Sequence, residues 1–268
     1  MQGLALSNRQ TLANANNPFR RYAREPVHEV RQPDVTGQSF AERVAKARQM
    51  LRSMDPEKVK QVIEFRRDLN FLQALALAKQ EGSIIVPNDV HDRILTETTD
   101  EQYLRQNYPV WTGTLVIYEA PDKKFGEQVV SSWKKHNVDY SISFEVPEQF
   151  RGKTNCALVV EHPDFELIDF GNNKYELRAA DSNIHLVQDF AKKSGLYSTD
   201  HGIPVGLDVG FSKDASYLGR TADSYIGLIR RGVYVDLYGM GVYVLLNDDP
   251  SDRFRVALIS PVATSKEG

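Results

Sequence analysis

Three side chains of the kind that bind divalent metals alternate along one short segment of the chain. His162, Asp164 and Glu166 are each separated by one residue, so on a continuous strand they would point to the same face. One imidazole and two carboxylates are suitable ligands for a transition-metal ion. Pro163 gives the segment the character of a turn, however, and a solvated strand face explains the same residues. They are candidate metal ligands, but on balance the sequence predicts no metal and no cofactor.

A second candidate site lies in the long segment 191–216, which is rich in Gly, Ser and Asp. Ser198, Asp200 and His201 include a hydroxyl, a carboxylate and a base, the groups that nucleophilic catalysis requires. Neighbours in sequence rarely converge in this way, and the chain contains no Gly-x-Ser-x-Gly motif. Two interpretations remain: a catalytic or ligand-binding loop, with His185 as a further polar group, and a loop shaped only by its turn-forming residues.

Two arginines, Arg220 and Arg231, are candidate ligands for an anion or an acidic partner. Arg231 begins the stretch RGVYVDLYGMGVYVLL, residues 231–246, which has a partial likeness to the RNA-recognition signature. Tyr234 stands where that signature has a small residue, and Asp236 brings a negative charge toward phosphate. Alternating apolar and aromatic residues are typical of half-buried strands. We therefore predict an ordinary β-hairpin here rather than an RNA-stacking strand.

The composition excludes several classes of protein. Of the 268 residues, 41% are hydrophobic and the formal net charge is −3, so a core can form but the basic surface that binds nucleic acid is missing from the chain as a whole. The single cysteine, Cys156, rules out an internal disulfide framework, and its apolar surroundings predict a core residue. No apolar run is long enough to span a bilayer and no secretory signal is evident. We expect a cytoplasmic protein, or one within a cytoplasmically assembled particle, with no membrane partner.

Residues 1–38 differ from the rest of the chain. Their arginines outnumber their acidic residues, prolines recur, and no apolar period is sustained, so this segment is predicted to be an extended or disordered arm. Ordering it would cost about 1–2 kcal/mol of backbone entropy per residue, which requires a large surface to lie on. The cluster Arg20, Arg21, Tyr22 and Arg24 is the candidate partner-binding element. Nucleic-acid binding through this basic arm is a further alternative.

The apolar spacing then predicts two helices, 40–52 and 56–80, with Asp55 as N-cap and Pro56 at the first helical position of the second. They would form a helical hairpin, 39–82, ahead of a mixed to β-rich domain, 83–268. A short helix is predicted at 88–95 and another at 126–137. Strands are predicted from 138 onward, with tight hairpin turns at 171–173 and 247–252. The predicted class is α+β, an N-terminal helical hairpin followed by a predominantly antiparallel β-rich body.

These features favour a non-enzymatic structural or assembly protein. It would make protein–protein contacts, with copies of itself or with another protein, through the arm and the β-rich body, for example in a large particle such as a virion. The alternative is an enzyme or small-ligand-binding protein that uses the 191–216 loop, with Asp200 and His201.

Overall fold

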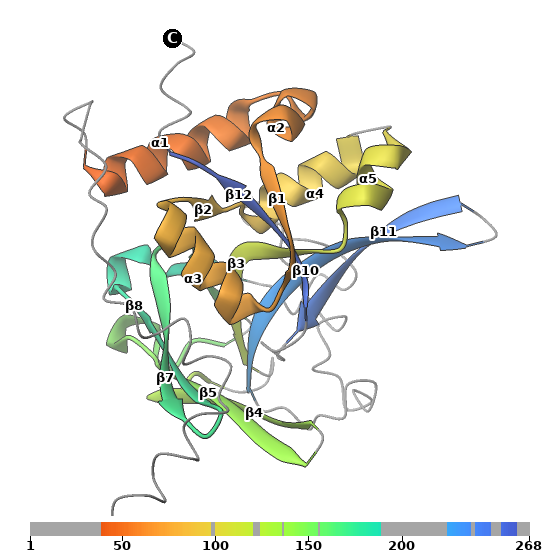
Figure 1. Cartoon of the computed structure of the whole chain (residues 1–268). Coiled ribbons are helices and arrows are strands. Elements are labelled where there is room, and N and C mark those ends of the chain that lie inside the picture. Colours follow the sequence, from red (N-terminus) through yellow and green to blue (C-terminus); the bar gives the residue numbers. More distant parts are fainter. Residues whose placement is uncertain are drawn as a thin grey trace, which may run out of the picture. The chain divides into compact units, whose positions relative to one another are not determined.

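The computed structural model describes residues 39–97, 100–119, 124–135, 137–154, 156–188, 224–236, 239–247 and 253–261 (Figure 1). For β10 and β11, defined below, the description covers the backbone and its pairing. Residues Phe40–Gly268 form one compact unit, separate from Met1–Ser39. The predicted arm and the 191–216 loop lie outside the described residues. None of the described helices is long and apolar enough to cross a membrane.

Helices and strands alternate in the first half of this unit, and strands dominate the second half. The helices are α1 (Phe40–Ser53), α2 (Pro56–Val62), α3 (Phe71–Glu81), α4 (Asn88–Glu97) and α5 (Glu101–Asn107). The strands are β1 (Glu64–Leu69), β2 (Ile84–Ile85), β3 (Val110–Glu119), β4 (Gln128–Lys135), β5 (Val138–Glu145), β6 (Cys156–Glu161), β7 (Phe165–Gly171), β8 (Lys174–Ala179), β9 (His185–Gln188), β10 (Ser224–Asp236), β11 (Gly239–Asn247) and β12 (Phe254–Ile259). The predicted α+β class is confirmed.

The larger sheet has eight strands, in the order β1-β12-β3-β10-β11, with β2 beside β12 and with β6 and β9 branching from β3. All its pairs are antiparallel except β12 with β3. The smaller sheet has the order β4-β5-β8-β7, with β5 and β8 parallel. Because β1 pairs with β12, a strand from the first part of the compact unit and one from its last part meet in one sheet.

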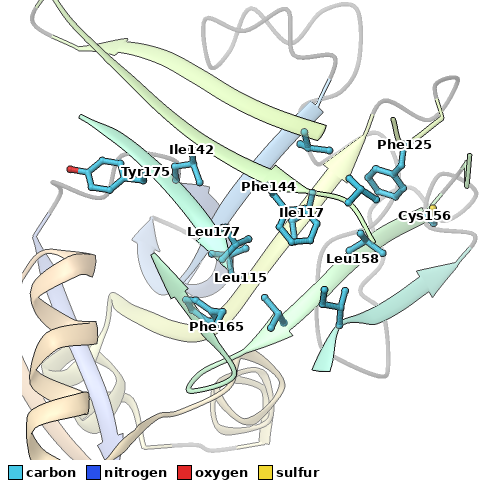
Figure 2. Packing of buried hydrophobic residues seen from close by; sticks show 14 of the residues in the cluster. Leu115, Ile117, Phe125, Ile142, Phe144, Cys156, Leu158, Phe165, Tyr175 and Leu177 are labelled. Carbon is cyan, nitrogen blue, oxygen red and sulfur yellow. The ribbon is translucent and has the colours of Figure 1, made fainter. Parts of the chain in front are cut away.

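Side chains alternate between the two faces of the larger sheet, and each face carries its own core. On one face, Ala257, Ile259 and Val110 pack against the apolar stripes of α1, α2, α4 and α5. On the other face, Val256, Leu258 and Ile85 pack against α3. This second face also carries Leu115, Ile117 and Leu158, which pack against Ile142, Phe144, Tyr175 and Leu177 of the smaller sheet (Figure 2). The result is a layer of helices, the larger sheet, and a layer formed by α3 and the smaller sheet.

The predicted helical hairpin is not confirmed, because the predicted helix 56–80 is interrupted by β1. Asp55 does cap α2, accepting a hydrogen bond from the backbone N–H of Glu57. The chain then extends and pairs with β12, and α3 begins anew at Asn70, whose side chain and that of Gln73 form a reciprocal capping box. The buried residues are Pro56 and Val59 in α2 and Phe71, Ala74 and Ala78 in α3, and the apolar spacing across both segments did not reveal the break.

The predicted helix at 126–137 is also wrong, since residues 128–135 form β4. Val129 points into the core and Val130 is exposed, which is the period of a strand rather than of a helix. All eight residues of β4 pair with β5. Pairing with the next strand in the chain overrides the helical spacing of the apolar residues here.

The predicted hairpin at 171–173 is confirmed: β7 and β8 are antiparallel, and Gly171, Asn172 and Asn173 all have positive φ. The hairpin predicted within 231–246 is also confirmed, as β10 and β11 pair antiparallel from Leu228–Asn247 to Asp236–Gly239. The hairpin predicted at 247–252 is wrong. In the described residues β11 pairs with β10, whereas β12 pairs with β1, β2 and β3.

Candidate functional site: a charge cluster at the fork of the larger sheet

One edge of β3 changes its pairing strand at Gly113, and we call this position the fork of the larger sheet. Before this point Val110 and Trp111 pair with β12, and after it Thr114–Tyr118 pair with β6. At the fork itself, the N–H of Gly113 donates to the carbonyl of Val86 at 2.8 Å, and the carbonyl of Gly113 accepts from the N–H of His162 at 2.7 Å. The backbones therefore approach more closely than a side chain would allow. A Cβ at position 113 would lie 2.2 Å from the carbonyl oxygen of Ile85.

Charged side chains from three places in the sequence converge beside this fork. Arg48 and Arg52 come from α1, Asp89 from the first turn of α4, Glu161 from the end of β6, and Asp164 from the turn that follows it. We refer to these five residues as the charge cluster. Glu161 is only 4% exposed and Arg48 14%, whereas Arg52 and Asp164 are about a third exposed, so the cluster is buried on the side of Glu161 and reaches water on the other.

Arg48 holds the turn that joins β6 to β7. Its guanidinium donates to the Asp164 carboxylate at 2.7 Å, and to the backbone carbonyls of Glu161 and His162 at 2.9 and 2.6 Å. A planar group with several donors in fixed directions is suited to bind a carboxylate and two carbonyls together. The contact joins α1 to a segment more than a hundred residues away along the chain.

Arg52 joins α1 to α4 and to β6. It donates to Asp89 through Nε at 2.6 Å and to Glu161 through Nη2 at 2.5 Å. Burial alone would lower the pKa of Arg52, but the hydrogen bonds and charges of Asp89 and Glu161 outweigh it and raise the pKa above its ordinary value. Arg52 therefore remains a cation at every accessible pH.

Local structure explains why both arginines reach the cluster. They are four residues apart on α1 and so lie on one side of it, beside the buried Ala47 and Leu51. Arg93 of α4 fixes the end of the same helix by donating to the backbone carbonyls of Arg52 and Met54 at 2.5 and 3.1 Å. These carbonyls would otherwise lack partners at a helix C-terminus.

His162 is a structural acceptor beside the cluster. Its ring is 5% exposed, and its Nδ1 accepts a hydrogen bond from the backbone N–H of Ile85 at 3.1 Å. Burial, together with the nearby charge of Arg48, lowers the pKa of His162 to about 3. The imidazole is therefore neutral at physiological pH, and the proton-free Nδ1 is occupied by the backbone.

The three candidate metal ligands have different partners in the structure. His162 binds the backbone of β2, Asp164 binds Arg48, and the exposed Glu166 pairs with Lys79 at 3.3 Å. The segment 162–164 is the turn that Pro163 suggested. Within the described ranges, no group of three or more His, Cys, Asp or Glu side chains is arranged to hold a metal ion.

The other candidate residues from the sequence are only partly covered. Asp200, His201 and Arg220 lie outside the described residues, as do Arg20, Arg21, Tyr22 and Arg24 of the arm. Arg231 lies in β10, opposite Val244 of β11 and Val110 of β3. His185 begins β9 and is exposed. Cys156 is 3% exposed within the core, which confirms its prediction as a core residue.

The charge cluster was not predicted from the sequence. One signal was present: Arg48 and Arg52 lie next to the apolar stripe of a predicted helix, at a spacing that places both on one side. The acidic partners gave no signal, because Asp89 and Glu161 come together with α1 only through the tertiary fold.

Acid is expected to destabilise the folded chain through His162. In the folded state the imidazole stays neutral down to about pH 3, whereas in the unfolded chain it binds a proton near its ordinary pKa of about 6.5. The unfolded state therefore gains protons first, and the free energy of unfolding falls by about 2 kcal/mol between about pH 7 and about pH 5 on account of this group.

Urea unfolding across this pH range, for the natural chain and for His162→Asn, provides the measurement. The asparagine retains an acceptor for the N–H of Ile85 but has no titrating group. The natural chain should lose about 2 kcal/mol more than the variant. Equal losses in both proteins would show that His162 takes up its proton in the folded state too.

The fold and the site together define an α+β protein with two packed sheets, in which a partly buried charge cluster joins a helix to the fork of the larger sheet. Comparison with protein-family models finds no match, and neither the curated proteins nor the solved structures give a significant match. Its function is therefore inferred from the residues of this chain alone.

Proposed function

We propose that the chain is a non-enzymatic structural or assembly protein. It makes protein–protein contacts, with copies of itself or with a different protein, through the arm 1–38 and the β-rich body. A component of a large particle, such as a virion, is the setting in which such a protein would work.

The observation that supports this proposal is that the groups of the charge cluster are engaged with one another and with the backbone. Its arginines and carboxylates bind one another and the backbone at 2.5–2.9 Å. A catalytic carboxylate or base needs hydrogen-bond reach to a substrate atom. Here, the charges stabilise the attachment of α1, which directly follows the arm in sequence. Because α1 is firmly held, an arm that binds a neighbouring molecule would be anchored to the body through α1.

The alternatives involve residues that the structure does not describe. An enzyme or small-ligand protein would use Asp200 and His201 in the 191–216 loop, and a nucleic-acid-binding protein would use the arginines of the arm. No contact among the described residues favours either one, so the assembly role remains our proposal.

Deletion of residues 1–38 tests the proposal, with the mass in solution measured by light scattering. We expect the full chain to have a mass greater than that of one chain, and the shortened chain to have a lower mass at the same concentration. Circular dichroism of the shortened chain serves as the control for folding. A full chain and a shortened chain of the same oligomeric state would remove the arm from the account.

A further inference from the structure

The β10–β11 hairpin reaches beyond the strand that anchors it. Only Ser224–Arg231 of β10 pair with β3, and the pairing ends where Arg231 lies opposite Val110, the first residue of β3. In the described part of the chain, Gly232–Asp236 pair only with Gly239–Tyr243 of β11. We call these two segments the distal ribbon (Figure 1). A two-stranded ribbon is marginally stable in water and gains from a further strand.

β11 is the last strand of the larger sheet on this side, and among the described residues its partner is β10. Its nine residues, GMGVYVLLN, include no charged residue. Edge strands that avoid pairing with other chains usually carry charges, above all lysine, or are very short. A long neutral edge presents its N–H and C=O groups without this protection.

The other edge strands of the described sheets do carry such protection. β1, EFRRDL, has four charged residues in six; β4 ends in Lys134 and Lys135; and β7 carries Glu166 and Asp169. β9 is only four residues long. The absence of charge is therefore particular to β11 among the long edges, and does not reflect a general lack of charge in the chain.

We infer that β11 is a contact strand between two copies of this chain, paired antiparallel with β11 of the second copy about a two-fold axis. This inference rests on the proposed assembly function and names the surface that serves it. In such a pair each residue lies opposite a residue of the same strand, so any charge near the centre would face a like charge. A strand without charges meets no such repulsion. The two hairpins then form one continuous sheet, β10-β11-β11-β10, in which the distal half of each β11 lies beside residues 243–247 of the other copy.

If the two β11 strands pair over their full length, the position that lies on the two-fold axis is defined and can be substituted. The central residue of Gly239–Asn247 is Tyr243, which would face Tyr243 of the second copy. Within its own hairpin Tyr243 lies opposite Gly232, a residue without a side chain, so a new charge there meets no charged residue directly opposite it. The variants are Tyr243→Lys and Tyr243→Glu, purified separately. Sedimentation velocity of each alone and of an equal mixture gives the oligomeric state.

Each variant alone should dimerise about tenfold more weakly than the natural chain, because like charges face each other across the axis. The mixture should recover the dimer, because opposite charges then face each other. Ser132→Lys, which adds a lysine to the exposed edge strand β4, should leave the mass unchanged. The inference is overturned if the natural chain is monomeric, if either variant alone dimerises like the natural chain, or if the mixture fails to recover the dimer.

The result also separates this inference from the proposed function. If removal of residues 1–38 lowers the mass in solution but charges at position 243 do not, the assembly role stands and β11 is not the contact strand. A natural chain that is monomeric, with β11 amides protected from hydrogen exchange, would show that another segment of the same chain covers this edge.

Discussion

Replacement of Gly113 by alanine is expected to lower the free energy of unfolding by about 3 kcal/mol or more. The new Cβ would lie 2.2 Å from the carbonyl oxygen of Ile85 and 2.9 Å from its carbonyl carbon. These are backbone atoms of β2, and they cannot move aside without disturbing the hydrogen bond from Gly113 to Val86. The strain would therefore fall at the fork, where β3 stops pairing with β12 and begins to pair with β6.

Gly126→Ala is the matched control, because nothing lies within 4 Å of a Cβ at that position. It should change the stability by less than about 0.5 kcal/mol, as is usual for surface substitutions. Urea unfolding of the two variants and the natural chain gives both values. Similar stabilities for Gly113→Ala and Gly126→Ala would mean that β2 and β3 do not approach each other as described.

Replacement of Glu161 by alanine is expected to cost about 2–3 kcal/mol, since it removes the carboxylate that Arg48 and Arg52 share and leaves each with one carboxylate partner, Asp164 or Asp89. Glu161 is 4% exposed, and it lies 2.5 Å from Arg52 and 3.5 Å from Arg48. Breaking one side of a buried ion pair is more costly than replacing both sides with apolar residues.

Glu166→Ala provides the comparison, because Glu166 forms an exposed ion pair with Lys79. Its loss should be smaller than about 1 kcal/mol. A double-mutant cycle with Arg52→Met and Glu161→Met should show a coupling of about 1–3 kcal/mol, measured by urea unfolding. Additive effects of the two substitutions would show that the Arg52–Glu161 pair does not contribute to the attachment of α1 to β6.

Local sequence signals were sufficient where the structure depends on local contacts. Asp55 and Pro56 begin α2 as predicted, and Gly82 ends α3 in the left-handed conformation that glycine favours. The positive φ angles of Gly171, Asn172 and Asn173 form the predicted turn between β7 and β8. In α1, which was predicted as a helix over 40–52 from its apolar spacing, Val44, Ala47 and Leu51 are buried, although Phe40 is 44% exposed.

Two of the failures have one physical cause: the deciding contacts lie far apart in the chain. β1 is rich in charge and has little strand character of its own, yet it pairs with β12, close to the other end of the compact unit. The charge cluster likewise joins residues more than a hundred positions apart. The failure at β4 is different, because β4 pairs along its whole length with β5, the next strand in the chain. The apolar period of a segment shows which of its faces is apolar, but not which helix or strand packs or pairs with it.

The view that this chain assembles with copies of itself depends on its oligomeric state, and sedimentation equilibrium of the full-length protein measures that state most directly. We predict a weight-average mass that rises with protein concentration, from that of one chain toward that of two chains or more. A mass equal to one chain over the whole concentration range would contradict self-assembly and would turn attention to the 191–216 loop.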